Sequence, residues 1–214
     1  MLCTFKLKKY PFCVKFNPEY DKQNLFLMGS SNKKVSQFDI NSGQRVLQYD
    51  QHLGTVNTIT FIEPKKFVTS SDDKKLFVWE FGIPVVYKHV SEPEMHAVTS
   101  AVMHPNGEYY AGQSSDNHAV IDEAMVDNFL RYIAMKFASH YCAGYACGIS
   151  FSNDGQFLAS GDERGRLFFY DWKTAKNYRT LDAHANVCIG VEWHPNDQTK
   201  VLTCGWEGLI KLWE

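Results

Sequence analysis

The stretch Val68-Thr-Ser-Ser-Asp-Asp-Lys-Lys-Leu-Phe-Val-Trp-Glu80 carries the pattern on which the fold prediction rests. It contains two short runs of apolar and small hydroxyl residues with a polar segment between them, and the second run ends in the aromatic–acidic pair Trp79-Glu80. Short β-branched and aromatic runs around Asp and Lys are typical of two antiparallel strands joined by a tight turn. We therefore expect a strand on each side of Asp72-Asp73.

The aromatic–acidic ending recurs along the chain. Related segments occupy residues 35–39, 167–171 and 209–214, and a weaker copy occupies residues 119–123. The closing positions 38, 79, 122, 170 and 213 are separated by 41, 43, 48 and 43 residues. A period of about 40–45 residues is the length of one four-stranded propeller blade. The sequence therefore predicts an all-β propeller of about five four-stranded blades.

Each unit repeats the same internal order of segments. A β-branched run is followed by a turn rich in Pro, Asn, Asp or Gly, then by a hydroxyl-rich run, and then by the aromatic–acidic segment. A more polar run comes last, as suits an outer edge strand, because charge discourages pairing with other chains. We predict a single domain with blades at about 12–51, 52–90, 96–137, 146–182 and 187–214, with residues 1–7 as a further strand.

Residues 122–142 fit this order least well. Their Ala, Met and Leu content, with apolar residues at helical spacing, favours an amphipathic helix. Their position in the repeat instead requires the fourth strand of blade three. We favour the strand, because the neighbouring units constrain this segment and tertiary context overrides propensity.

Several longer stretches resemble the WD-repeat pre-mRNA-processing factor 17 family, collinearly and nearly end to end. The clearest are Val187-Cys-Ile-Gly190, Trp193-His-Pro195 and Cys204-Gly-Trp-Glu-Gly-Leu-Ile-Lys-Leu-Trp213. Pro11-Phe-Cys-Val-Lys-Phe-Asn-Pro18 adds to them, and the similarity fades at residues 119–141. The resemblance implies a nuclear spliceosome component that acts around the second transesterification step as a scaffold without catalytic residues. The partners it implies are spliceosomal proteins, with RNA as a candidate, at the blade faces.

The family carries a long amino-terminal extension and a seven-bladed propeller, whereas this chain has five units, a partial or small ring by comparison. Contacts that the extension makes are therefore not carried over. Residues 1–7 could supply the fourth strand of the last blade and close the ring, which would remove both free sheet edges. We favour this closed or nearly closed ring over an open five-blade arc that is a fragment of a larger gene product.

WD-repeat propellers also contain a buried hydrogen-bonded chain of a loop His, a strand hydroxyl, a turn Asp and a strand Trp. Buried polar groups are tolerated only when each has a partner, and such a network then fixes the loops. Units one, three and four lack members of this set. In unit four, for example, Arg164 stands at the turn position and Tyr170 at the position of the Trp. We therefore expect blades two and five to be the stiffest and blade three to be the loosest. The two fuller sets are His52, Thr69 or Ser71, Asp73 and Trp79 in blade two, and His184, Thr203, Glu207 and Trp213 in blade five.

Composition excludes several classes of protein. Hydrophobic residues make up 44% of the 214, enough for a folded core. No apolar run approaches the roughly 20 residues that a membrane helix needs. The 22 basic and 24 acidic residues give a formal charge of -2, which argues against a globally basic nucleic-acid binder. Six scattered cysteines indicate a reducing compartment, the cytosol or nucleus.

The cysteines and histidines also raise the question of a zinc site. Structural zinc typically uses ligand pairs two to four residues apart, and Cys142 and Cys147 do not have this spacing. The sequence contains none of the hydrolase, phosphate-loop or dinucleotide motifs. We therefore predict no metal, no cofactor, no small-molecule substrate and no enzymatic activity. The residues considered for zinc are His140, Cys142, Cys147, His184, Cys188, His194 and Cys204.

Two lysine doublets, Lys33-Lys34 and Lys74-Lys75, end four residues before the closing aromatics Phe38 and Trp79. They should therefore occupy equivalent turns of consecutive blades, on one face. Such a patch could bind RNA phosphates or an acidic protein, although turn lysines are also common as simple solvated residues.

Two functions stay open at this point. The leading hypothesis is a nuclear, non-catalytic spliceosomal scaffold that supports pre-mRNA splicing. The alternative is a WD-repeat peptide-binding adaptor of another nuclear or cytosolic assembly, in which one propeller face binds a short peptide. The stretches around Cys188 and Cys204 favour the scaffold.

Overall fold

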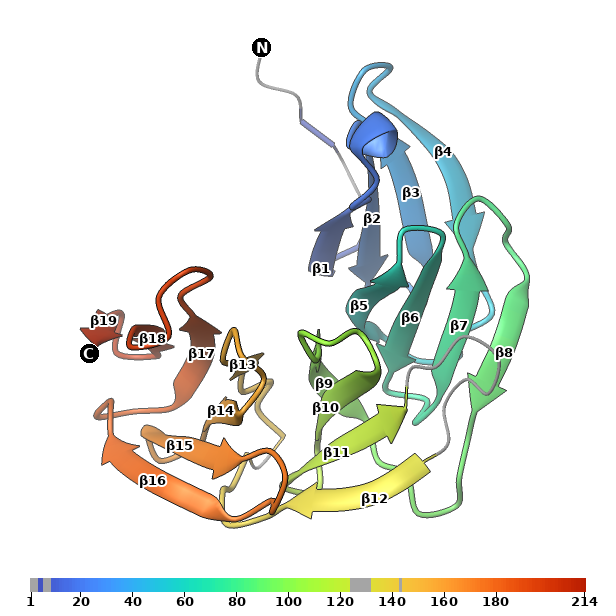
Figure 1. Cartoon of the computed structure of the whole chain (residues 1–214). Coiled ribbons are helices and arrows are strands. Elements are labelled where there is room, and N and C mark those ends of the chain that lie inside the picture. Colours follow the sequence, from blue (N-terminus) through green and yellow to red (C-terminus); the bar gives the residue numbers. More distant parts are fainter. Residues whose placement is uncertain (1–3, 6–8, 124–131, 143) are drawn as a thin grey trace. The chain divides into compact units, whose positions relative to one another are not determined.

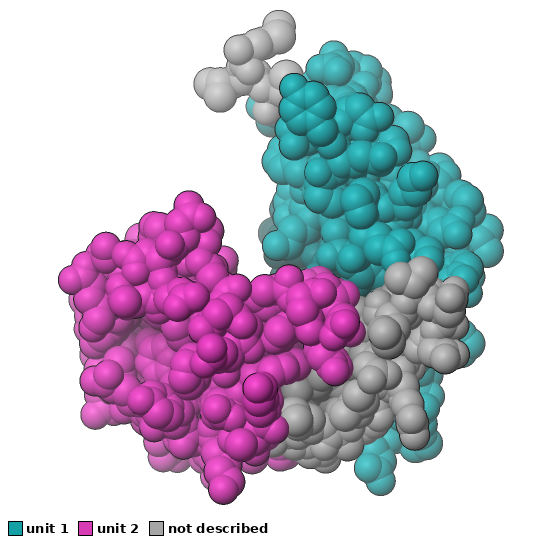
Figure 2. All heavy atoms as spheres, in the orientation of Figure 1, with its two compact units in different colours: residues 1–98 teal, residues 99–214 magenta. Residues whose placement is uncertain are grey.

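The computed structural model describes residues 4–5, 9–123, 132–142 and 144–214. They form five antiparallel sheets and one turn of 3-10 helix, Tyr20–Lys22. No helix in these residues is long and apolar enough to cross a membrane. The predicted all-β fold of repeated small sheets is confirmed, and none of the sheets in the described residues closes on itself. The chain divides into two compact units, residues 1–98 and 99–214, which are coloured separately in Figure 2.

The first unit holds blades one and two, each a four-stranded sheet whose strands follow in chain order (Figure 1). Their β-branched and aromatic residues alternate between the two faces of each sheet, as the pleat requires. The strands of blade one are β1 (Pro11–Phe16), β2 (Leu25–Ser30), β3 (Val35–Asp39) and β4 (Gln44–Tyr49), and those of blade two are β5 (Val56–Glu63), β6 (Lys66–Ser71), β7 (Leu76–Glu80) and β8 (Val86–Val90).

Blades three, four and five follow, and the second unit begins at residue 99, within the first strand of blade three. Blades three and four have four strands, whereas blade five has three in the described residues, one fewer than predicted. The strands of blade three are β9 (Val98–Met103), β10 (Tyr109–Ser114), β11 (His118–Glu123) and β12 (Tyr132–Phe137); those of blade four are β13 (Ile149–Phe151), β14 (Phe157–Gly161), β15 (Arg166–Asp171) and β16 (Asn177–Asp182); those of blade five are β17 (Cys188–Trp193), β18 (Val201–Gly205) and β19 (Ile210–Trp213).

The segment with conflicting helix and strand patterns contains a strand. β12 pairs antiparallel with β11, with Ala119 opposite Phe137 and Asp122 opposite Tyr132. The strand prediction is therefore confirmed for residues 132–137, while residues 124–131 lie outside the described part of the chain. Pairing with the sheet supplied hydrogen bonds that outweighed local helix propensity.

The predicted strand at residues 1–7 falls mostly outside the described residues, and so does its pairing with the last blade. Of this segment the structure describes Thr4 and Phe5. The Phe5 ring lies on blade one, with its centroid 5.0 Å from that of Phe26 and 5.3 Å from that of Phe38.

Within each unit, neighbouring blades pack with side chains of one sheet covering aromatic rings of the other. In the first unit, Leu27 and Tyr49 of blade one share a buried cluster with Phe67 and Trp79 of blade two. The Tyr49 ring meets both aromatic rings edge to face at 5.2 Å. This burial removes large apolar surfaces from water and fixes the two sheets face to face.

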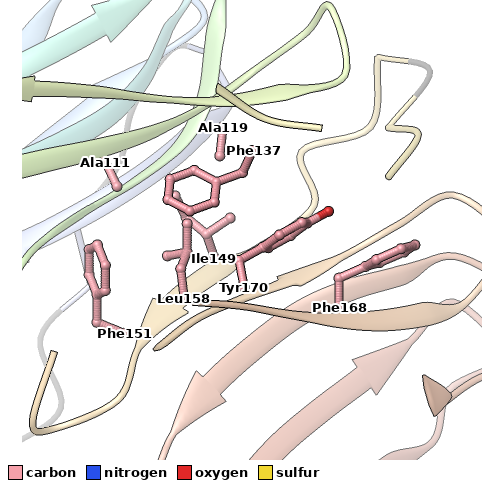
Figure 3. Close-up of a cluster of buried hydrophobic side chains, with 8 residues drawn as sticks. All are labelled: Ala111, Ala119, Phe137, Ile149, Phe151, Leu158, Phe168 and Tyr170. Carbon is pink, nitrogen blue, oxygen red and sulfur yellow. The ribbon is translucent and has the colours of Figure 1, made fainter. Parts of the chain in front are cut away.

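The second unit repeats this packing between blades three and four (Figure 3). The small side chains Ala111 and Ala119 and the ring of Phe137 lie against Leu158 and Tyr170. The rings of Phe137 and Tyr170 are 5.4 Å apart at an interplanar angle of 62°. The small alanine side chains on one sheet leave room for these rings to pack against it.

The turn between the second and third strands has the same backbone shape in all five blades. One residue there has a positive φ: Lys33 (70°), Lys74 (63°), Asn117 (70°), Gly165 (79°) and Gly208 (84°). At Gly165, a Cβ atom would lie 2.1 Å from the carbonyl oxygen of His184, whereas nothing lies within 4 Å of the corresponding point at Gly208. Only at Gly165 does close packing, in addition to φ, require glycine.

This contrast predicts different costs for the same substitution. Gly208→Ala should lower the free energy of unfolding by about 1 kcal/mol, the cost of a left-handed conformation for a residue with a Cβ atom. Gly165→Ala should cost about 3 kcal/mol or more, because the backbone at His184 must also move. Urea denaturation followed by tryptophan fluorescence measures both. Equal losses in the two variants would contradict the proposed close approach.

Candidate interaction surface and the networks that hold it

The lysine doublets occupy equivalent turns of blades one and two. Lys33 and Lys74 are exposed and have the positive φ of the turn, and Lys34 and Lys75 follow them, partly buried. A left-handed conformation costs a residue with a Cβ atom about 1 kcal/mol. Blades three, four and five place Asn or Gly there, which adopt it more readily. Lysine residues with a strained backbone therefore occupy the same turn position in both blades, and we take this turn surface as a candidate functional site.

In both blades, a side-chain oxygen in the turn accepts a hydrogen bond from the backbone of the lysine doublet. In blade one, the Asn32 side-chain oxygen accepts hydrogen bonds from the backbone N–H of Lys34 at 3.1 Å and from the Ser30 hydroxyl at 2.6 Å. In blade two, Asp73 accepts from the backbone N–H of Lys75 at 3.1 Å. The turn conformation that presents the lysines is thus fixed by a side chain two residues before the second lysine.

Asp73 connects this turn to a buried network in blade two. Its Oδ2 lies 2.9 Å from His52 Nδ1 and accepts the Leu53 N–H at 2.8 Å. His52 Nε2 lies 2.7 Å from the Thr69 hydroxyl, which also accepts the Trp79 indole N–H at 2.8 Å. Each polar side-chain atom of this four-residue network has a hydrogen-bond partner, as burial requires.

The hydroxyl group that bonds to both His52 and Trp79 is that of Thr69. Ser71, the other residue that the sequence analysis considered for this role, forms no hydrogen bond with them. Ser71 is buried, and its Oγ accepts the backbone N–H of Asp73 at 3.2 Å. Burial alone would raise the pKa of Asp73, but hydrogen bonds from His52 and the Leu53 N–H outweigh burial and lower it. The Asp73 carboxylate is therefore held in its charged form.

Blade five contains the same kind of hydrogen-bonded network, with Glu207 in the place of the shorter Asp. His184 Nδ1 lies 2.5 Å from Glu207 Oε1, and His184 Nε2 lies 2.8 Å from the Thr203 hydroxyl. The Trp213 indole N–H donates to that hydroxyl at 2.9 Å. The four residues proposed from the sequence therefore form one hydrogen-bonded network in blade five, and Trp213 packs against a buried cluster that includes Ala159 and Leu167 of blade four.

Blade four contains a network that sequence reasoning missed. The Tyr170 hydroxyl lies 2.8 Å from His140 Nδ1, and His140 Nε2 lies 2.9 Å from Gln113 Oε1. Arg164, which the sequence had set beside Tyr170, instead donates its backbone N–H to Asp162. The tyrosine hydroxyl replaces both the Trp and the strand hydroxyl, and Gln113 comes from the preceding blade. Only the repeat position of His140 pointed to this network.

His140 is neutral in this arrangement. Burial lowers its pKa from 6.5 to about 4. The Gln113 amide nitrogen donates to the carbonyls of Ser114 and His118, so its oxygen faces His140 as an acceptor. Nε2 then carries the proton, and Nδ1 accepts from Tyr170. A second proton on His140 would leave the tyrosine without an acceptor for its O–H.

The residues considered for zinc do not gather into a site. In the described part of the chain, no group of three or more His, Cys, Asp or Glu side chains is placed to hold a metal ion. Cys142, Cys147 and Cys188 are fully buried, and burial raises the pKa of Cys188 to about 12. These thiols are packed as small apolar side chains.

The blade-two network predicts which hydroxyl matters for stability. Thr69→Val should lower the free energy of unfolding by about 3 kcal/mol, because it leaves the Trp79 N–H and a buried His52 nitrogen without partners. Ser71→Ala should cost about 1 kcal/mol, since one backbone N–H loses its acceptor. Chemical denaturation of the two variants tests this order. A larger loss for Ser71→Ala would show that Thr69 is not the central hydroxyl.

The pKa of His140 predicts a pH dependence of stability. Between pH 6.5 and about 4, the unfolded chain binds a proton at His140 that the folded chain does not. Stability from this residue is therefore complete above pH 6.5 and falls as the pH drops, by up to about 1.4 kcal/mol per pH unit. His140→Gln should remove this part of the slope, while the other titrating groups remain as a shared background. Parallel slopes for the two proteins in urea titrations would contradict the assignment.

Comparison with known families supports the repeat architecture. The family described as "WD domain, G-beta repeat" matches residues 43–80, 133–171 and 175–214. These three segments together cover more than half of the chain.

Individual proteins are similar over longer stretches. The chain is 51% identical over 215 aligned residues to pre-mRNA-processing factor 17 of Homo sapiens, covering 100% of this chain and 37% of that protein. It is 33% identical over 190 residues to pre-mRNA-processing factor 17 of Saccharomyces cerevisiae, covering 86% and 42%. WD repeat-containing protein 25 of Mus musculus is 26% identical over 208 residues, covering 94% and 38%. The resemblance seen in the sequence motifs is confirmed, and the chain spans about two-fifths of the length of these relatives.

Proposed function

This chain belongs to the WD-repeat family, and from that premise we propose that it acts in pre-mRNA splicing as a non-catalytic scaffold of the spliceosome. The observation that carries the proposal is the 51% identity, over the whole chain, to a protein named pre-mRNA-processing factor 17. Action around the second transesterification step and a nuclear location are part of the same proposal.

The use of the ionisable groups supports a role without catalysis. His52 and Asp73 bond to each other and to neighbouring groups, and His184 and His140 are engaged in the same way. Asp72, the neighbour of Asp73, accepts from the Asn57 side chain at 2.9 Å. Acid–base catalysis needs a titratable group that can reach a substrate, whereas these groups are used to hold turns in place.

The lysine turns offer a surface for a negatively charged partner. Lys33 and Lys74 are exposed, and Lys34 Nζ lies 3.9 Å from Asp50 Oδ2. An exposed pair at this distance contributes little, so most of the positive charge remains available. RNA phosphates are the partner that such a patch fits through electrostatic attraction and counterion release.

Co-purification from nuclear extract tests the assembly. The full chain, tagged and added to extract, should recover small nuclear ribonucleoproteins and splicing proteins. The alternative of a WD-repeat peptide-binding adaptor predicts a different set, such as ubiquitin-ligase or histone proteins. Recovery of that second set without splicing components would overturn the splicing proposal.

The lysine surface gives a prediction with a matched control. Changing Lys33, Lys34, Lys74 and Lys75 to Glu should weaken binding of a labelled single-stranded RNA at least tenfold. It should also reduce the slope of log affinity against log salt by about 3, since each lost phosphate contact removes about 0.7. The control changes four exposed lysines outside these turns to Glu, with the same change in net charge: Lys15, Lys65, Lys173 and Lys176. An unchanged slope in the first variant, or equal changes in both, would remove the RNA assignment.

A further inference from the structure

The turn between the second and third strands of blade five carries an exposed tryptophan. Trp206 lies two residues before Gly208, which has the positive φ of this turn, and its side chain is 57% exposed. The same turn position is exposed or partly exposed in all five blades. The other four blades place a polar residue there: Ser31, Asp72, Ser115 and Glu163. Access to solvent is therefore a property of the turn position, and blade five uses it to present a large aromatic ring.

Neighbouring groups hold Trp206 and its turn in place. The Trp206 backbone N–H donates to the Val187 carbonyl at 3.0 Å, and the Gly208 N–H donates to the Gly205 carbonyl at 3.0 Å. The partly exposed ring of Tyr145 meets the Trp206 ring edge to face, with the centroids 4.8 Å apart and an interplanar angle of 85°. The two rings thus form one fixed aromatic surface that reaches solvent.

The loop that carries Tyr145 also carries a second aromatic group. Tyr141 is exposed, and the Arg164 guanidinium lies 5.5 Å from the centroid of its ring. The Tyr141 carbonyl accepts the Glu163 backbone N–H at 2.7 Å, which joins this loop to the turn of blade four. Tyr141 and Tyr145 are four positions apart in the chain, so their Cα atoms lie at most about 14 Å from each other. A short extended ligand can therefore contact both aromatic groups.

The charge that reaches solvent on this surface is positive. The Arg164 side chain is 66% exposed, whereas Glu163, which lies 3.9 Å from it, is 25% exposed. Glu207 is only partly exposed and Asp162 is fully buried, and each of these acids contacts a basic side chain. A ligand that approaches the aromatic groups meets the Arg164 cation first, and this favours an anionic ligand over a cationic one.

We propose that these side chains form a stacking site for unpaired bases of single-stranded RNA, an inference that rests on the RNA binding proposed above. One base stacks on the Trp206–Tyr145 pair. A second base stacks against Tyr141 and the planar guanidinium of Arg164, whose charge also faces the phosphates. Aromatic rings and arginine planes are the groups on which splayed bases stack in proteins, and stacking accepts every base because each has a flat face.

Fluorescence anisotropy with the full 214-residue chain tests the site. The probe is a fluorescein-labelled RNA dodecamer of alternating A and C, which forms no duplex. Trp206→Leu, which removes the aromatic plane, should weaken binding about tenfold, the effect of losing one stacked base. Trp206→Phe keeps a ring and should restore most of the affinity. Neither variant should change the slope of log affinity against log salt, because no phosphate contact is lost. Tyr20→Leu, a change at an exposed ring in a different turn of blade one, is the matched control and should bind as the original chain does.

A second probe separates stacking from charge. It keeps the sugar–phosphate backbone of the dodecamer but has no bases, so Trp206→Leu should leave its weaker binding unchanged. Exchange of the four turn lysines for Glu should instead weaken binding of both probes. The lysine surface and the stacking site are thus measured independently, and either can fail while the other stands.

Three results would overturn the stacking site. The first is equal binding of the dodecamer by Trp206→Leu and the original chain. The second is an equal loss for the probe without bases. The third is a Trp206→Leu variant that loses affinity for an arginine-rich peptide and keeps its affinity for RNA. If the original chain binds no RNA at all, the stacking site and the RNA assignment of the lysine turns both fall, while co-purification still decides the role in splicing.

Discussion

The Thr69 hydroxyl lies between two buried nitrogen atoms, 2.7 Å from His52 Nε2 and 2.8 Å from Trp79 Nε1. A hydroxyl can donate one hydrogen bond while it accepts another, so it satisfies both nitrogens at once. His52 in turn positions Asp73, and Asp73 holds the turn that carries Lys74 and Lys75. A surface feature is therefore fixed by a contact in the interior of the blade, and the cost of leaving any member unpaired keeps the chain of contacts intact.

The networks of blades two, four and five use different residues for the same purpose, which is to give each buried polar group a hydrogen-bond partner. Blade five uses the longer Glu207 in place of an Asp, and its second carboxylate oxygen is buried without a hydrogen-bond partner. Blade four lets the Tyr170 hydroxyl reach His140 directly and takes the remaining partner, Gln113, from the preceding sheet. In each case a neutral or paired histidine bridges a loop and a strand.

Much of the fold was predictable, because each blade has nearly the same length. The aromatic residue that ends the third strand therefore recurs at a nearly constant spacing, which can be read from the sequence. The strand at 132–137 was predictable from its place in that period and not from its composition. The different roles of Thr69 and Ser71 were not predictable, since both residues lie on one face of β6. Only the register with β7, which places Thr69 opposite Phe77, distinguishes the two positions. Gln113 was missed because it contacts His140 across 27 residues of chain, which no local pattern records.

The buried thiols have a consequence for the way this protein meets oxidants and alkylating reagents. Only the thiolate reacts, and burial raises the pKa of Cys13 and of Cys188 to about 12. At neutral pH a negligible fraction is ionised, and the sulfur of Cys188 is also closed off from solvent. Any reaction at Cys188 must therefore wait for the sheets around it to separate, so the rate of its modification would record how often blades four and five come apart.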